Sequence, residues 1–197
     1  MGPGGVPTGL FVAAVLIGLA VGFLLGVRPQ DYAHAELKAG WAFVLAALIE
    51  ALVRRGALAG WLDPATWGRG LELLALLLIA YGLLLNLHLR GIWLVALGFF
   101  MNTLAILTHG GQMPVTADAL RRAGIAKAIP VLEKRGDGLH VLAPPGDPLW
   151  WLGDIIPLRH QVISLGDLAI LFGVALATVE LGFEGKRRRM DTVKRDG

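Results

Sequence analysis

Long apolar runs separated by short charged turns dominate the pattern of this chain. Four of the runs carry few charges and are long enough for a membrane helix: residues 10–26, 71–89, 92–108 and 163–183. A helix rises about 1.5 Å per residue, so about 20 residues cross a bilayer core of about 30 Å. We therefore predict a membrane-spanning helix in each of these runs.

A fifth run, residues 40–53, is shorter and carries Glu50. Arg54 and Arg55 close it, and two interpretations are open. The run spans the membrane if the arginines extend toward the headgroups, or it lies at the interface as a surface helix. The turn that follows holds indole rings typical of an interface and a turn-forming pair, namely Trp61, Trp67 and Asp63-Pro64.

Together these runs predict an all-α fold, an integral membrane bundle of about five transmembrane helices within one domain, residues 1–185. Residues 109–161 are more polar, and we expect them to form a small extracytoplasmic cap between the fourth and fifth spans. In the cap, Thr116 is typical of a helix N-cap and Gly124 of a helix end. Two further short elements are expected there, a helix at residues 126–135 and a strand at residues 139–142.

The distribution of Lys and Arg predicts the orientation. The basic tail, residues 186–197, directly follows the last span, and positive charge favours the cytoplasmic side. An odd number of spans then leaves the N-terminus outside, and we expect a multi-pass protein of the bacterial inner membrane. The loop charges are divided, with Arg28, Lys38 and Arg90 on the inside and Arg54, Arg55 and Arg69 on the outside.

Composition narrows the class of protein further. With 55% hydrophobic residues, 17% charged residues and a mean hydropathy of +0.64, the chain is too apolar for a soluble enzyme of its size. It contains no cysteine, which excludes disulfides, thiolate metal sites and cysteine nucleophiles. The net charge of +3 comes largely from the tail, and no aromatic and basic platform accompanies it, so we predict no nucleic-acid binding. The expected partners are membrane lipids, with a membrane-protein partner or a second copy of the chain as alternatives.

Polar residues concentrate where the last two spans reach the outer face. Asp154 approaches the membrane from the cap, and Asp167 opens the final span. Two carboxyl groups that share a proton can act as acid and base on water, so we predict Asp154 and Asp167 as a catalytic pair. A structural alternative is open for Asp167, because Ser164 at an N-cap with Asp167 three residues later is also typical of a helix start.

Other residues near this pair are candidates for binding a substrate. Asn102 lies within a span, where an amide either binds a ligand or hydrogen-bonds a neighbouring helix. His109 and His140 are candidate proton carriers, but their spacing matches no zinc motif, and we predict neither a metal nor another cofactor. The predicted substrate-binding residues include a glycine-rich turn, and the full set is Asn102, His109, Gly110, Gly111, Met113, Pro114 and Ser164.

A linked set of motifs occupies the second half of the chain. These are Asn102, G-G-Q-M-P-V at residues 110–115, L-G-D-I-I-P at 152–157 and S-L-G-D at 164–167. In this arrangement the chain resembles a bacterial family of small multi-pass membrane proteins with no assigned function. The resemblance covers about half the chain and implies a membrane protein of unknown function. His109 stands where members of that family often carry asparagine.

The last of these motifs is also similar to one in the lipoprotein signal peptidases, which are four-span aspartic proteases. This resemblance implies that Asp167 corresponds to a catalytic aspartate, in the F-N-x-A-D motif of that family. Asp154 then corresponds to the aspartate of the V-D-F motif, and Asn102 to the asparagine of G-N-x-x-D-R. Ala105 stands where the other catalytic aspartate belongs, and Ser164 replaces an asparagine, so a protease would need Asp154 as its second carboxylate.

Three classes of function fit these residues. The first is an accessory or assembly subunit, in which polar groups only join helices, and it requires the least of the residues. The second is a membrane-embedded hydrolase or transferase, with Asp154 and Asp167 acting on a lipid-linked or membrane-anchored substrate at the outer leaflet. The third is a small-solute transporter or channel lined by Asn102, Asp167 and Glu50, against which stands the lack of an internal repeat.

Overall fold

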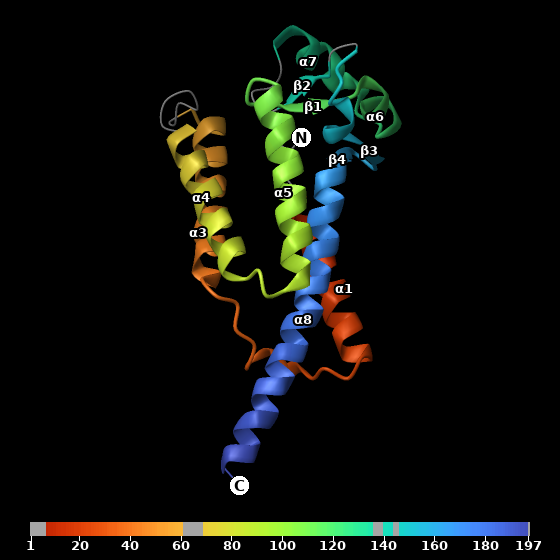
Figure 1. Ribbon diagram of the computed structural model, residues 1–197. Helices are drawn as coiled ribbons and strands as arrows, with labels where there is room; N and C mark the ends of the chain where they lie inside the picture. Colours follow the sequence, from red (N-terminus) through yellow and green to blue (C-terminus); the bar gives the residue numbers. More distant parts are fainter. Residues whose placement is uncertain (1–6, 61–68, 136–139, 144–145, 197) are drawn as a thin grey trace.

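The computed structural model describes residues 7–60, 69–135, 140–143 and 146–196. The chain is mostly helical, with a small four-stranded sheet at one end (Figure 1). The long helices form a bundle, and the sheet with its short helices forms a cap at one end of it (Figure 1). The predicted turn with Trp61, Asp63, Pro64 and Trp67 lies outside the described residues.

The long helices of the bundle follow the predicted apolar runs to within about five residues, except that α8 continues well beyond the predicted end at residue 183. The helices are α1 Thr8–Leu24, α2 Pro29–Tyr32, α3 Gly40–Leu58, α4 Arg69–Leu85, α5 Arg90–Thr108 and α8 Leu165–Asp196. The agreement is good because local breaks in the apolar pattern determine where these helices end. α8 continues through the basic tail and projects beyond the other helices, away from the cap (Figure 1).

Among the described residues, two helical segments are long and apolar enough to cross a membrane, Arg90–Thr108 and Leu165–Lys194. Three shorter apolar helices accompany them, Thr8–Leu24, Gly40–Val53 and Leu73–Leu85. Short apolar helices also occur in the cores of soluble proteins, so length alone does not make them spans. The arrangement with five spans therefore stays a prediction.

Glycines bring α5 and α8 into backbone contact. A side chain at Gly98 would collide with the carbonyl oxygen of Gly166, and one at Gly91 would collide with that of Gly173. Small residues at an interface let two helices approach closely and gain van der Waals contact. α1 meets α8 in the same way, because Gly18 lies against the α8 backbone. These three helices form the most closely packed part of the bundle.

The helices α3 and α4 form a hairpin with an apolar core of its own. Its buried residues are Ala46, Ile49 and Val53 from α3 and Ala75 from α4. A second cluster joins the hairpin to α5 and α8, and its members are Leu83, Leu89, Ile92 and Ala177. The hairpin is thus attached to the rest of the bundle near the α4–α5 turn, at the end remote from the cap (Figure 1).

The cap contains a mixed sheet, which corrects the all-α prediction. Its strands are β1 Met113–Val115, β2 His140–Leu142, β3 Asp154–Leu158 and β4 Gln161–Ser164, in the order β2-β1-β3-β4. β1 is parallel to β2 and β3, whereas β3 and β4 form an antiparallel hairpin. The strand predicted at residues 139–142 corresponds to β2, of which residues 140–142 are described. The other three strands were not predicted, because segments this short satisfy their backbone groups only by pairing across the cap.

Short helices connect the strands of the cap. They are α6 Ala117–Arg122, the 3-10 helices η2 Ala126–Ala128 and η3 Trp150–Leu152, and α7 Ile129–Arg135. The Thr116 hydroxyl accepts a hydrogen bond from the Ala119 N–H at 3.3 Å, and Gly124 has a φ of +76°. The predicted N-cap and helix end are therefore confirmed. The apolar core of the cap consists of Val115, Leu120 and Leu132.

Candidate functional site

A group of polar side chains, the rim cluster, lies where the cap joins α5 and α8. Its members are Asn102, His140, Asp154, Ser164 and Asp167. They come from α5, from β2, β3 and β4, and from the first turn of α8. All except Asn102 are buried, and Ser164 is completely shielded from solvent. The cluster therefore belongs to the interior of the junction.

Three members of the rim cluster are joined in a closed hydrogen-bond network. Asn102 Nδ2 donates to Asp167 Oδ1 at 2.8 Å, and Ser164 Oγ donates to Asn102 Oδ1 at 2.8 Å. The Asp167 N–H donates to Ser164 Oγ at 2.9 Å, and the Ser164 N–H donates to Asp167 Oδ2 at 3.2 Å. Both oxygens of the Asp167 carboxyl group and both polar atoms of the Asn102 amide thus have partners within the chain.

The local sequence explains how this network forms. The reciprocal bonds of Ser164 and Asp167 are a capping box at the start of α8, as the structural alternative predicted. Gly166 then lets α5 approach, because a side chain there would collide with Asn102 Oδ1. Asp167 consequently has two roles: it caps its own helix and accepts a hydrogen bond from a neighbouring helix. The structure thus shows the capping alternative for Asp167, while its catalytic role stays a prediction.

Asp154 is the buried acid on the cap side of the cluster. It begins β3 and lies opposite Ser164 on β4, and it is 4% exposed. His140 Nε2 lies 3.8 Å from its Oδ2. Burial, together with the negative charge of nearby Asp167, raises the pKa of Asp154 well above its ordinary value. The fold thus brings the two predicted catalytic carboxyl groups near each other, while their catalytic role stays a prediction.

His109 does not join the rim cluster. It is the C-cap of α5, and its Nε2 lies 2.6 Å from Oδ2 of Asp147, with both side chains less than 10% exposed. Its Nδ1 lies 2.8 Å from the carbonyl oxygen of Ala105, so both ring nitrogens face an oxygen atom. Sequence reasoning missed Asp147, because an aspartate between a glycine and a proline is also typical of a turn.

The Asp147 carboxyl group is well supported. Its Oδ1 accepts a hydrogen bond from the Leu149 N–H at 2.9 Å, and the other oxygen faces His109. Burial raises the pKa of Asp147, but these two contacts lower it more, so that it lies below its ordinary value. This pair fixes the chain that leads into η3 against the end of α5.

The glycine-rich turn between α5 and β1 separates into two parts. Gly110 and Gly111 have φ values of +65° and +88°, a conformation that favours glycine, and both are exposed. Met113 and Pro114 are buried in the cap, and Gly153 lies directly against the Pro114 carbonyl oxygen. Within the structure Met113 and Pro114 therefore serve packing, and a substrate-binding role for the turn stays a prediction.

No group of three or more His, Asp or Glu side chains in the described residues is arranged to hold a metal ion. Glu50, the third residue of the predicted solute pathway, lies on α3 in the hairpin and is exposed. The contacts of Asn102 and Asp167 given above do not include it. The three polar residues of that pathway are thus divided between two parts of the bundle.

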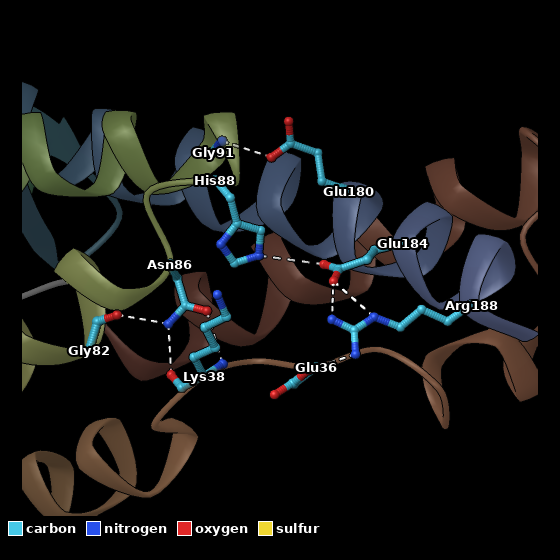
Figure 2. A network of polar contacts seen from close by, with 9 residues as sticks. All are labelled: Glu36, Lys38, Gly82, Asn86, His88, Gly91, Glu180, Glu184 and Arg188. Carbon is cyan, nitrogen blue, oxygen red and sulfur yellow. Dashed lines mark hydrogen bonds and ion pairs between the residues drawn. The ribbon is translucent and has the colours of Figure 1, made fainter.

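A second polar region, the base network, lies at the end of the bundle remote from the cap. We define it as Asp31, Glu36, Lys38, Asn86, His88, Glu180, Glu184, Arg188 and Arg189, most of which Figure 2 shows. Asn86 is fully buried, and its amide donates to the carbonyls of Lys38 and Gly82 at 2.7 Å each. The Glu180 carboxylate accepts from the Gly91 N–H at 2.9 Å, at the start of α5 (Figure 2).

Ion pairs complete the base network. Arg188 contacts Glu36 at 2.6 Å and Glu184 at 2.7 Å, and His88 lies 3.5 Å from the other Glu184 oxygen (Figure 2). Arg189 Nε donates to Asp31 Oδ1 at 2.7 Å. Burial raises the pKa of Asp31, but the Arg28 N–H and the Arg189 guanidinium lower it below its ordinary value. Two arginines of the basic tail therefore hold other parts of the chain.

Comparison with known proteins identifies one family. The model of the "Family of unknown function (DUF5317)" matches residues 34–179. This match includes α3 to β4 and the first half of α8, and hence the whole rim cluster. No curated protein and no solved structure matches the chain.

Proposed function

The chain belongs to the DUF5317 family of unknown function, and we propose that it is a non-enzymatic accessory or assembly subunit of the bacterial inner membrane. In this proposal five apolar helices cross the bilayer, with the N-terminus and the cap outside and the basic tail in the cytoplasm. The cap is the part that a partner in the membrane or periplasm would contact.

Exposed apolar side chains support the membrane placement. Each of four helices carries a large apolar residue that is at least 58% exposed, namely Leu16, Leu48, Leu77 and Phe100. Apolar surface on this scale, distributed around several helices, would lead to aggregation in water but is suited to lipid. The orientation rests on the cations at the base, because positive segments stay on the cytoplasmic side.

The observation that carries the accessory role is the closed network of the rim cluster. The polar atoms of Asn102, Ser164 and Asp167 bond to one another and to the α8 backbone. Such a network joins the cap to α5 and α8, and leaves few bonding positions for a substrate. A rigid cap held above a bundle is a suitable docking platform.

Asp167→Asn tests this role. Asparagine keeps the shape but replaces one acceptor oxygen with a donor, so the bonds from Asn102 and the Ser164 N–H cannot both persist. We expect a loss of about 2 kcal/mol in the free energy of unfolding in detergent. Blue native electrophoresis of membranes should also show the chain leaving a larger assembly. Asp118→Asn, on the exposed face of α6, is the matched control. An unchanged assembly with a lowered melting temperature would contradict the role of the cap.

One observation favours a second candidate, the membrane-embedded hydrolase or transferase at the outer leaflet. Asp154 holds its proton to higher pH than an ordinary aspartate, and Asp167 lies close enough to influence it. A protonated and an ionised carboxyl group side by side can act as acid and base on a lipid-linked substrate. This candidate predicts that Asp154→Asn abolishes complementation of a deletion strain while melting temperature and assembly are retained.

A further inference from the structure

The end of α1 presents exposed apolar side chains beside a group of cations. Phe23, Leu24 and Leu25 are 45%, 85% and 57% exposed. Gly26 then reverses the chain with a φ of +84°, and exposed Arg28 follows two residues later. A membrane-embedded helix that ends in this way places apolar side chains at acyl-chain depth and a cation at headgroup depth.

α8 adds two neighbouring cations, Lys186 and Arg187, and the first of them contacts the turn after α1. Lys186 Nζ donates a hydrogen bond to the Gly26 carbonyl oxygen at 2.8 Å, which joins the tail to the turn after α1. An ammonium group has three N–H donors, so Lys186 keeps two for another acceptor. Arg187 is the next residue of α8 and is exposed. One cation therefore contacts the turn after α1, and two more lie within two residues of that contact along the chain.

These cations differ from the other basic residues of the tail. Arg188 and Arg189 are bound to Glu36, Glu184 and Asp31. The ion pairs found among the described residues include neither Arg28, Lys186 nor Arg187. Lys186 lies near enough to Asp31 to act on it electrostatically, but the Asp31 carboxylate is already bonded to Arg189 and to the Arg28 N–H. The neighbourhood thus has an excess of positive charge.

We propose that Arg28, Lys186 and Arg187 bind the phosphate of an acidic phospholipid whose acyl chain lies along Phe23, Leu24 and Leu25. Guanidinium and ammonium groups are the usual donors to phosphate oxygens, and a cationic site next to exposed apolar residues matches both parts of a lipid. A free phosphate ion would use the cations but not the apolar residues. The proposal rests on the membrane placement given above.

The test uses the full-length chain in detergent, with native mass spectrometry and thermal unfolding as readouts. Phosphatidylglycerol and phosphatidylcholine of the same chain length are titrated in parallel. We expect preferential retention of phosphatidylglycerol. In the triple variant R28Q/K186Q/R187Q, retention should fall about a hundredfold, since each cation near an anionic headgroup contributes about fivefold. Glutamine at position 186 keeps a donor for the Gly26 carbonyl, so the fold should survive.

The matched control is R121Q/K127Q/R159Q, which removes the same charge from exposed positions of the cap. It should retain phosphatidylglycerol like the unmodified chain. Equal binding of phosphatidylcholine, or full binding by the triple variant, would overturn the proposal. Competition by inorganic phosphate at equal concentration would also overturn it, because the site would then recognise the ion alone. Leu24→Ser should weaken lipid retention without changing any response to phosphate.

Failure of the proposed membrane placement would give a different result from failure of the lipid site. A chain that is monodisperse and folded without detergent would contradict the placement, whatever its lipid preference. A chain that needs detergent but does not distinguish the two lipids would contradict only the lipid site. The melting temperature without added lipid, which should be the same in the triple variant and its control, excludes misfolding as the cause.

Discussion

Asp154 in the rim cluster and Asp31 in the base network are both buried carboxyl groups, with 4% and 0% exposure, yet their surroundings act on them in opposite ways. Asp154 faces another acid, so burial and repulsion raise its pKa. Asp31 faces Arg189 and a backbone N–H, which lower its pKa despite burial. The charge of the nearest partner thus decides whether the pKa of a buried acid lies above or below its ordinary value.

The two regions also differ in how they hold the fold. The rim cluster uses short side chains and buried hydrogen bonds close to the α8 start, where glycines bring the helices together. The base network uses long, partly exposed side chains, such as Arg188 and Glu36 at 46% and 54% exposure. Buried bonds are costly to break, whereas exposed ion pairs contribute little and are screened by salt. We expect the rim to be the stronger junction.

The largest effect should follow a side chain introduced at the rim. Gly166→Ala puts a methyl group against Asn102 Oδ1 and the Gly98 carbonyl oxygen, so α5 and α8 must separate. We expect a loss of about 3 kcal/mol in the free energy of unfolding, measured by denaturant titration in mixed micelles. Gly9→Ala in α1, where nothing lies within 4 Å, should be neutral or stabilising. Similar values for the two variants would refute close packing at the rim.

The local stability of the rim cluster and that of the base network should change with pH in opposite directions. Asp154 binds its proton more tightly in the folded state, so its contribution is present below its ordinary pKa of 3.8 and is lost as pH rises through the higher folded value. Asp31 contributes above 3.8, and this is lost as pH falls through its lower folded value. Hydrogen exchange, corrected for intrinsic rates, should therefore show β3 and β4 opening toward higher pH and α2 opening in acid.

Single substitutions assign this pH response to its groups. Asp154→Asn should reduce the pH dependence in β3 and β4 and leave that of α2 intact, and Asp31→Asn should reduce that of α2 alone. Parallel loss of protection in both regions at one pH would mean that the two ends unfold as a unit. In that case the rim cluster and the base network would not differ in stability.

A smaller effect is expected at the ion pairs of the base network. Arg188→Gln removes contacts with Glu36 and Glu184, so the free energy of unfolding should fall slightly in low salt and less at high ionic strength. Arg187→Gln removes the same charge from the neighbouring position, which has no ion pair in the described part of the chain. A loss in Arg188→Gln that does not change with salt would show that packing, not charge, holds the base together.

The smallest effect concerns Tyr32, which fits between Gly22 of α1 and Gly182 of α8. Its hydroxyl is buried and has no hydrogen-bond partner in the described residues. A buried polar group without a partner is costly, so Tyr32→Phe should leave the free energy of unfolding unchanged or raise it by up to about 1 kcal/mol. A melting curve in detergent measures this as an unchanged or slightly higher melting temperature. A clear decrease in the melting temperature would show that this hydroxyl makes a hydrogen bond in the folded protein.

Much of the fold could be predicted from local pattern. The apolar runs mark the long helices to within about five residues except at the end of α8, and Thr116 and Gly124 mark the ends of a cap helix. The neighbourhood of Asp154 and Asp167 was also predictable, because both residues lie near the start of α8 along the chain. These features depend on residues close together along the chain.

Other features had no local signal. His109 and Asp147 are 38 residues apart, and Asp31 and Arg189 are 158 residues apart. Each of these residues is also typical of a turn, a helix end or a solvated tail. The strands of the cap are three to five residues long and acquire their backbone partners only from one another.

The sequence by itself thus determined which segments are helical, how apolar they are and which end of the chain is basic, because these properties sum over neighbouring residues. Only the tertiary structure decided which acids have a raised or a lowered pKa, which cations are already paired and how the cap is attached. Those outcomes depend on distances between residues far apart in the chain, because hydrogen bonds form only over a few ångströms and Coulomb interactions weaken as two charges separate.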